Sequence, residues 1–239
     1  MSLAGRLMNI FADPAGVFDA IKASAPSVGN WLVPMLALIV VGLVGVSLAF
    51  PQPAIQQQFK EMTDQMIQKM VEKQHVPEAQ AEQARPIISA SVKAGPFMAP
   101  VIIAVVTPFW GGLIVWLGAR VFKSPLPYMR GLEVAGLANT ILILDAVVRT
   151  LLMFIMGNIY ASLSPALLVK GFNPQNPVHG LLAALSVMTF WTLAVRSLGM
   201  ARVTGISFAK AAGWIFGAWI LVTGLFAGVG MAMQGLGPK

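Results

Sequence analysis

The stretch ILILDAVVRT at residues 141–150 places two charged side chains inside an apolar run. Asp145 and Arg149 are four residues apart, so on a helix they share one face with the acid first, which favours pairing. Intramembrane charges usually pair or mark a functional site, so the two groups are either a structural contact or part of a proton, ion or headgroup site. The other apolar runs contain no acid to continue a relay, and we favour the structural interpretation. Glu133, earlier in the same run, is expected to meet Arg130 or interfacial water.

Residues that could catalyse a reaction or hold a metal are few. The chain has no cysteine, and neither His75 nor His179 has a second histidine near it in the sequence. The metalloprotease HExxH, hydrolase GxSxG and Walker-type Gly-Lys-Ser/Thr motifs are absent from the sequence. We therefore predict that the protein is not an enzyme and has no catalytic residue, cofactor or metal site.

The composition indicates an integral membrane protein. Hydrophobic residues make up 57% of the chain and charged residues only 10%, with a mean hydropathy of +0.76, whereas about a quarter of the residues of a soluble domain are charged. Lipid offers no hydrogen bonds to the backbone, so the long apolar runs must be helices, and the predicted fold class is an all-α polytopic membrane protein. The net charge of +7 is spread over short loops, which argues against nucleic-acid binding.

Five apolar runs have the length that crosses a bilayer, about 20 residues. The predicted transmembrane helices are residues 30–50, 96–121, 131–156, 178–198 and 211–233. The first run begins too far from the N-terminus for a signal peptide. Basic residues flank the second and fourth connections: Arg120, Lys123 and Arg130, then Arg196, Arg202 and Lys210. The positive-inside rule therefore predicts the inner membrane with a cytoplasmic N-terminus and an external C-terminus, although the lysine-rich first loop opposes this orientation.

The segments on either side of the first span are predicted to be helical but outside the bilayer. In residues 1–29, Asp13 is an N-cap followed by proline, which starts an amphipathic helix at the cytoplasmic interface. Residues 51–95 are predicted to form an external helical hairpin with a Met-rich apolar stripe and a break at Arg85-Pro86. We favour the interpretation that the stripe caps the bundle or lies on the lipid headgroups. The alternative is that it docks a partner.

Small residues gather on one face of the last span. Four glycines fall within about 60° on a helical wheel and form two GxxxG units: Gly213, Gly217, Gly224 and Gly228. We expect them to contact a helix of the same bundle, with another subunit as the alternative, so a homo-oligomer stays open. In the second span Pro108 is expected to kink the helix for structural reasons.

Two segments carry a resemblance to a known family. WLGARVFKSPLPYMRGLEVAGLANTILIL joins the second and third spans, and FWTLAVRSLGMARVTGISFAKAAGWIF joins the fourth and fifth. Together with the Asp-Pro helix and the five spans, they resemble the bacterial branch of the Yip (Ypt-interacting protein) domain family. The resemblance implies five transmembrane helices and a non-enzymatic role. Eukaryotic relatives bind Rab-type GTPases, and some bacterial relatives accompany ABC-type export machinery.

The chain departs from the family at three places. It has Phe122-Lys123 where bacterial relatives often carry Gly-Gly, and it lacks the eukaryotic Asp-Leu-Tyr-Gly-Pro motif and the long N-terminal tail of Rab-binding relatives. We therefore predict a bilayer protein that acts as a scaffold or accessory subunit for another membrane protein, such as an ABC-type exporter, and not a Rab receptor. The alternative is a small-solute or ion transporter that uses Asp145 and Arg149 as a midplane site.

Overall fold

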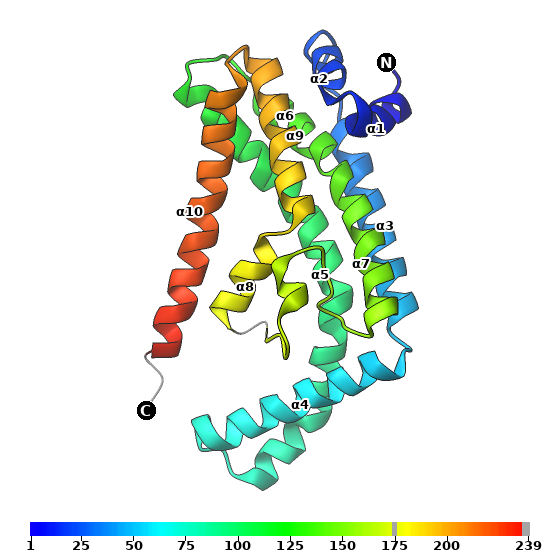
Figure 1. The fold of residues 1–239 in the computed structure, drawn as a ribbon, viewed down its shortest axis with the longest axis vertical. Helices are drawn as coiled ribbons and strands as arrows, with labels where there is room; N and C mark the ends of the chain where they lie inside the picture. Colours follow the sequence, from blue (N-terminus) through cyan, green and yellow to red (C-terminus); the bar gives the residue numbers. More distant parts are fainter. Residues whose placement is uncertain (174–175, 236–239) are drawn as a thin grey trace.

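A computed structural model gives the fold of residues 1–173 and 176–235 (Figure 1). The elements in chain order are α1 (Leu3–Ala12), α2 (Pro14–Lys22), α3 (Gly29–Ala49), α4 (Pro53–Gln74), α5 (Glu78–Val121), α6 (Tyr128–Ala138), α7 (Thr140–Met156), the 3-10 helix η1 (Pro165–Leu168), α8 (Pro177–Ala184), α9 (Val187–Thr204) and α10 (Phe208–Gly235). The described residues include no strand, which confirms the all-α class.

The long helices form a bundle whose two ends differ in what covers them. Helices α1 and α2 lie at one end with the α9–α10 connection, whereas α4 and the start of α5 project from the other end (Figure 1). The N-terminus and the end of α10 lie at opposite ends of the bundle (Figure 1). Helix α10 stands on one flank, where it contacts α9, α8 and α5. Because the start of the chain and the end of α10 lie at opposite ends of the bundle, the chain crosses it an odd number of times (Figure 1).

Four helices are long and apolar enough to cross a membrane, or five if the bent pair α8 and α9 is one span. The pair is bent by 55°, so the continuous helix predicted at residues 178–198 is wrong. The break has a local cause, because the Ser186 side chain accepts a hydrogen bond from the Met188 amide and thereby caps the start of α9. A second interruption, at Asn139, divides the predicted third span into α6 and α7.

The hairpin outside the bundle is built differently from the prediction. Helix α4 packs antiparallel on the start of α5, with Ile55 and Phe59 buried against Val92. The expected break at Arg85-Pro86 is wrong, because α5 runs unbroken through this proline. The ring of Pro86 removes one backbone hydrogen bond from α5. Beside it, Arg85 forms ion pairs with Asp64 of α4 and with Glu82.

The amphipathic N-terminal segment packs on protein. Asp13 caps α2, with its side chain accepting from the Gly16 amide at 3.0 Å. The apolar face of α2, which holds Val17, Phe18 and Ile21, is fully buried. Helix α2 contacts α9, where Gly199 leaves room for the Phe18 ring. The expectation that this helix lies along the membrane interface is therefore corrected in one respect, because its apolar face is turned to the bundle.

Candidate functional site

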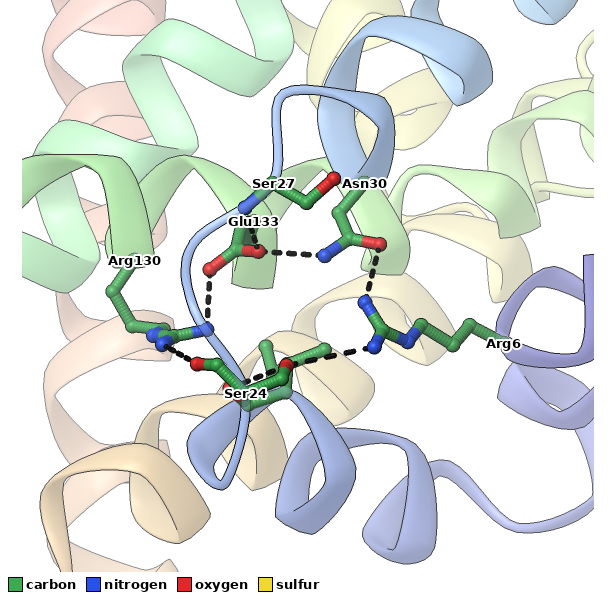
Figure 2. A network of polar contacts seen from close by, with 7 residues as sticks. Arg6, Ser24, Ser27, Asn30, Arg130 and Glu133 are labelled. Atoms are coloured by element: carbon green, nitrogen blue, oxygen red, sulfur yellow. Dashed lines mark hydrogen bonds and ion pairs between the residues drawn. The ribbon is translucent and has the colours of Figure 1, made fainter. Parts of the chain in front are cut away.

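A buried carboxylate lies near the start of α6. The Glu133 side chain is 0% exposed and accepts hydrogen bonds from Arg130 Nη1 at 2.6 Å, Asn30 Nδ2 at 2.6 Å and the Ser27 amide at 2.8 Å (Figure 2). The expected contact with Arg130 is present, but the alternative contact with interfacial water is absent because no part of Glu133 is accessible. A carboxylate this deep requires such partners to offset its lost hydration.

The same network ties the N-terminal segment to the bundle. Arg130 Nη2 donates to the Ser24 carbonyl at 2.6 Å, and Arg6 Nη1 donates to Asn30 Oδ1 at 3.1 Å (Figure 2). Residues of α1, of the loop after α2, of α3 and of α6 thus meet around one carboxylate. Sequence reasoning missed Arg6 and Asn30, because Asn30 is separated from Glu133 by 103 positions and no local pattern connects them. The full enclosure of Glu133 makes this network a structural clamp.

The intramembrane pair singled out in the sequence lies on α7. Arg149 Nε donates to Asp145 Oδ2 at 2.8 Å. The Asp145 side chain is 13% exposed and that of Arg149 is 36% exposed, so the acid is deeper than the base. Oδ1 of Asp145 is buried and has no hydrogen-bond partner among the described residues. One carboxylate oxygen therefore remains able to accept from another group.

A third charged group, Arg196, joins this region from α9. The sequence assigned Arg196 to the flank of a loop, which is wrong, because α9 continues to Thr204 and places Arg196 about two turns inside the helix. Its Nη2 donates to Asn139 Oδ1 at 2.9 Å, and Asn139 in turn donates to Thr107 Oγ1 at 3.0 Å. The described residues provide Arg196 with no ion pair. Nε of Arg196 is buried without a partner.

These three charges line one cavity of about 860 Å³. The volume falls within the range of about 300–1,000 Å³ that is typical of small-molecule sites. The cavity lies between α3, α4, α5, α7 and α9, with Trp219 of α10 on its wall. Most of its lining is apolar, and the polar lining residues are Ser91, Thr107, Asp145, Arg149, Thr150, Tyr160, Thr189, Thr192 and Arg196.

The outer end of the cavity lies under the hairpin. Met62 of α4 accepts a hydrogen bond from the Tyr160 hydroxyl at 3.3 Å, and both residues line the cavity. Burial raises the pKa of the Tyr160 phenol above its ordinary value, so the hydroxyl stays neutral and remains a donor at neutral pH. Met66, farther along the same helix, also lines the cavity and is 41% exposed. The Met-rich stripe is thus partly a wall of the cavity.

Close helix contacts occur at glycines other than those expected. The four expected glycines are open: a Cβ added at Gly213, Gly217, Gly224 or Gly228 would meet no neighbouring atom within 4 Å. The prediction that this face contacts a helix of the same bundle is therefore wrong for the described residues. Contact with another subunit stays a prediction. The close approach occurs instead between α5 and α6, where a Cβ added at Gly131 would lie 2.6 Å from the Gly112 carbonyl oxygen.

In the second span, a glycine lies where the side chain of another helix needs space. Pro108 is buried within α5, which continues past it to Val121. One turn farther on, a Cβ at Gly111 would lie 2.8 Å from Arg196 Cζ. The absence of a side chain at Gly111 therefore makes space for the Arg196 guanidinium. No group of three or more metal-ligating side chains occurs in the part of the chain that the structure describes.

Comparison with known proteins gives one match. The family model of the Yip1 domain matches residues 8–231, which is nearly the whole chain. No curated protein and no solved structure matches. The match includes α2, every residue of the clamp around Glu133 except Arg6, and every residue that lines the cavity. Together with the apolar helices, it makes this multi-pass membrane protein a member of the Yip1 domain family.

Proposed function

We propose that the protein is a non-catalytic subunit of the cytoplasmic membrane that associates with another membrane protein through α10. The observation that carries this proposal is the unoccupied glycine face of that helix. Gly217 and Gly224 adjoin open space, and the most apolar 18-residue window of α10 is only 6% buried, against 17–33% in the other candidate spans. A helix partner can approach a glycine face closely, backbone to backbone.

The bulky residues of α10 support the same assignment. Leu221, Leu225 and Phe226 are 71%, 64% and 74% exposed. In a bilayer such apolar side chains can contact lipid tails, so their exposure alone identifies no partner. Their combination with glycines on the same helix provides both a groove and ridges, the surface that van der Waals packing between helices requires. Export machinery of the ABC type is the partner class that the family resemblance suggests.

The absence of cysteine from the chain makes a clean crosslinking experiment available. A single cysteine at Gly217, oxidised in native membranes, should form a disulfide-linked dimer if the partner is a second copy. A photoreactive maleimide on the same cysteine should capture a different protein if the proposal holds. The added mass is then identified by mass spectrometry after mild-detergent extraction. Capture of lipid alone would overturn the proposal.

Bulky substitutions provide the second arm of the test. Gly224→Leu, introduced together with the cysteine at 217, should abolish the crosslinked complex, because the added side chain separates helices that touch through their backbones. Gly180→Leu is the matched control, since Gly180 also adjoins open space but lies on α8. The control should leave the complex unchanged. Equal complex formation by both variants would show that the α10 face is not the interface.

A small-solute or ion transporter is the second candidate function. The observation that favours it is the cavity of about 860 Å³ that contains the Asp145–Arg149 pair. Flux of a solute into proteoliposomes, lost on Asp145→Asn, would support this candidate and count against a purely associative role. Purified protein that moves no solute or ion in such vesicles would remove it.

A further inference from the structure

The strongest unexplained feature of the molecule is the uncompensated charge of Arg196. Its guanidinium has one neutral partner, Asn139 Oδ1, and its buried Nε has none among the described residues. Asp145, the one carboxylate on the cavity wall, is already bonded to Arg149. The three charged side chains of the lining therefore sum to +1. A cation within the apolar layer is costly unless an anion accompanies it.

The position of Arg196 defines the inner end of the cavity. Arg196 is the lining residue of α9 nearest to the helix end at Thr204, and Thr107 is the lining residue of α5 nearest to the end at Val121. Both helix ends lie on the side of the bundle that carries α1 and α2 (Figure 1). A ligand bonded to Arg196 would therefore place its charged group at the end of the cavity nearest to α1 and α2.

The outer half of the cavity is shaped for hydrocarbon. The wall along α5 extends from Ser91 to Thr107, about 24 Å at 1.5 Å per residue. Between these two polar ends the lining residues of this wall are apolar, and α4 adds Phe59 and Met62. The thioether of methionine adapts to flexible chains of different shape. The cavity thus combines one net positive charge at its inner end with a long apolar passage toward the hairpin.

We propose that the cavity binds a single-chain amphiphile with one negative charge, a long-chain carboxylate. The carboxylate accepts from the Arg196 guanidinium, which supplies the planar pair of donors that this group prefers. The hydrocarbon chain passes the Asp145–Arg149 pair and ends beneath α4. The charges of ligand and lining then sum to zero. This site is separate from the α10 face, and neither proposal depends on the other.

The test uses palmitate that carries a photoreactive diazirine, added to the full-length protein in nanodiscs of zwitterionic lipid. Labelled residues are mapped by mass spectrometry, and affinity is read from competition with unlabelled palmitate. Labelling should be saturable and should fall on the walls of the cavity. Arg196→Gln should weaken binding about tenfold, equivalent to about 1.4 kcal/mol. Arg202→Gln, on the same helix but outside the cavity, should leave binding unchanged.

Three controls separate the charge from the fold and from the bilayer. The diazirine analogue of palmityl alcohol should bind the native protein more weakly and be insensitive to Arg196→Gln, which also shows that this variant is folded. Ala99→Trp, which fills the apolar part of the cavity, should abolish labelling by both probes while Arg196 is intact. Inorganic phosphate at millimolar concentration should not compete.

The proposal fails under any of three results. Equal binding of the acid and the alcohol to the native protein would mean that the cavity holds lipid chains without regard to charge. Undiminished binding of palmitate to Arg196→Gln would remove the assigned counterion. Competition by phosphate, with no competition by palmitate, would make the cavity a site for small anions. Gly224→Leu, the variant expected to lose the α10 interface, should leave palmitate labelling unchanged, so failure of the α10 proposal can be distinguished from failure of this one.

Discussion

Replacement of Glu133 by alanine should be among the most destabilising single changes in this protein. The carboxylate is wholly enclosed, and its removal leaves Arg130, a residue only 8% exposed, without a counterion. It also removes the acceptor of the Asn30 amide and the Ser27 N–H. Breaking one partner of a buried ion pair costs about 3 to 5 kcal/mol, and we expect Glu133→Ala to fall in that interval. Unfolding in mixed micelles, followed by tryptophan fluorescence, measures the loss.

A double-mutant cycle shows whether the cost comes from the stranded charge. Glu133→Ala combined with Arg130→Ala should cost less than the sum of the single changes, because the double variant leaves no unpaired cation. A matched control is the exposed pair Arg202 with Asp19, in which α2 again bonds to the bundle, at 3.3 Å. Exposed pairs contribute about 0–1 kcal/mol, so Asp19→Ala should have little effect.

The native state offers an independent readout of the clamp. The network holds the loop after α2 against α6, so its loss should detach the N-terminal segment before the bundle unfolds. Trypsin should then cleave faster after Lys22 in Glu133→Ala than in the wild type or in Asp19→Ala. A loss below about 1 kcal/mol, or additivity of the two single changes within about 0.5 kcal/mol, would refute the reasoning.

Two further predictions concern the helix contacts and the intramembrane pair. Gly136→Ala should destabilise the fold by about 1–3 kcal/mol, since its Cβ would overlap the backbone of α3, whereas Gly224→Ala meets open space and should be neutral or stabilise by up to about 1 kcal/mol in a melting series of purified protein. The single change Asp145→Ala should destabilise the fold more than the double change Asp145→Ala/Arg149→Ala. Its cost should be smaller than that of Glu133→Ala, because the Arg149 side chain is 36% exposed. Equal or additive losses in the same series would contradict the pairing.

The broad architecture could be predicted because it depends on local properties of the chain. Hydropathy over about 20 residues reports whether a segment can enter lipid, and helices are then required. The contact between Asp145 and Arg149 is likewise local, since four residues return a helix to the same face. The N-cap at Asp13 depends on the next few residues alone and forms as its sequence indicates.

Tertiary structure decided the contacts between distant parts of the chain. The GxxxG pattern of α10 is local and visible, yet whether Gly217 faces a helix depends on how α10 packs, and within this chain it faces none. Glu133 and Asn30 lie at unrelated positions in the sequence, and only packing of α3 on α6 brings them together. In the sequence, Arg196 is interpreted as a loop cation because the predicted span ends two residues beyond it, at residue 198, and two further basic residues, Arg202 and Lys210, follow. Its position as an unpaired charge on a cavity wall depends on Asn139, which bonds to it, and on Gly111, which leaves room for it, both from other parts of the bundle. The energy of a buried charge depends on such neighbours in space.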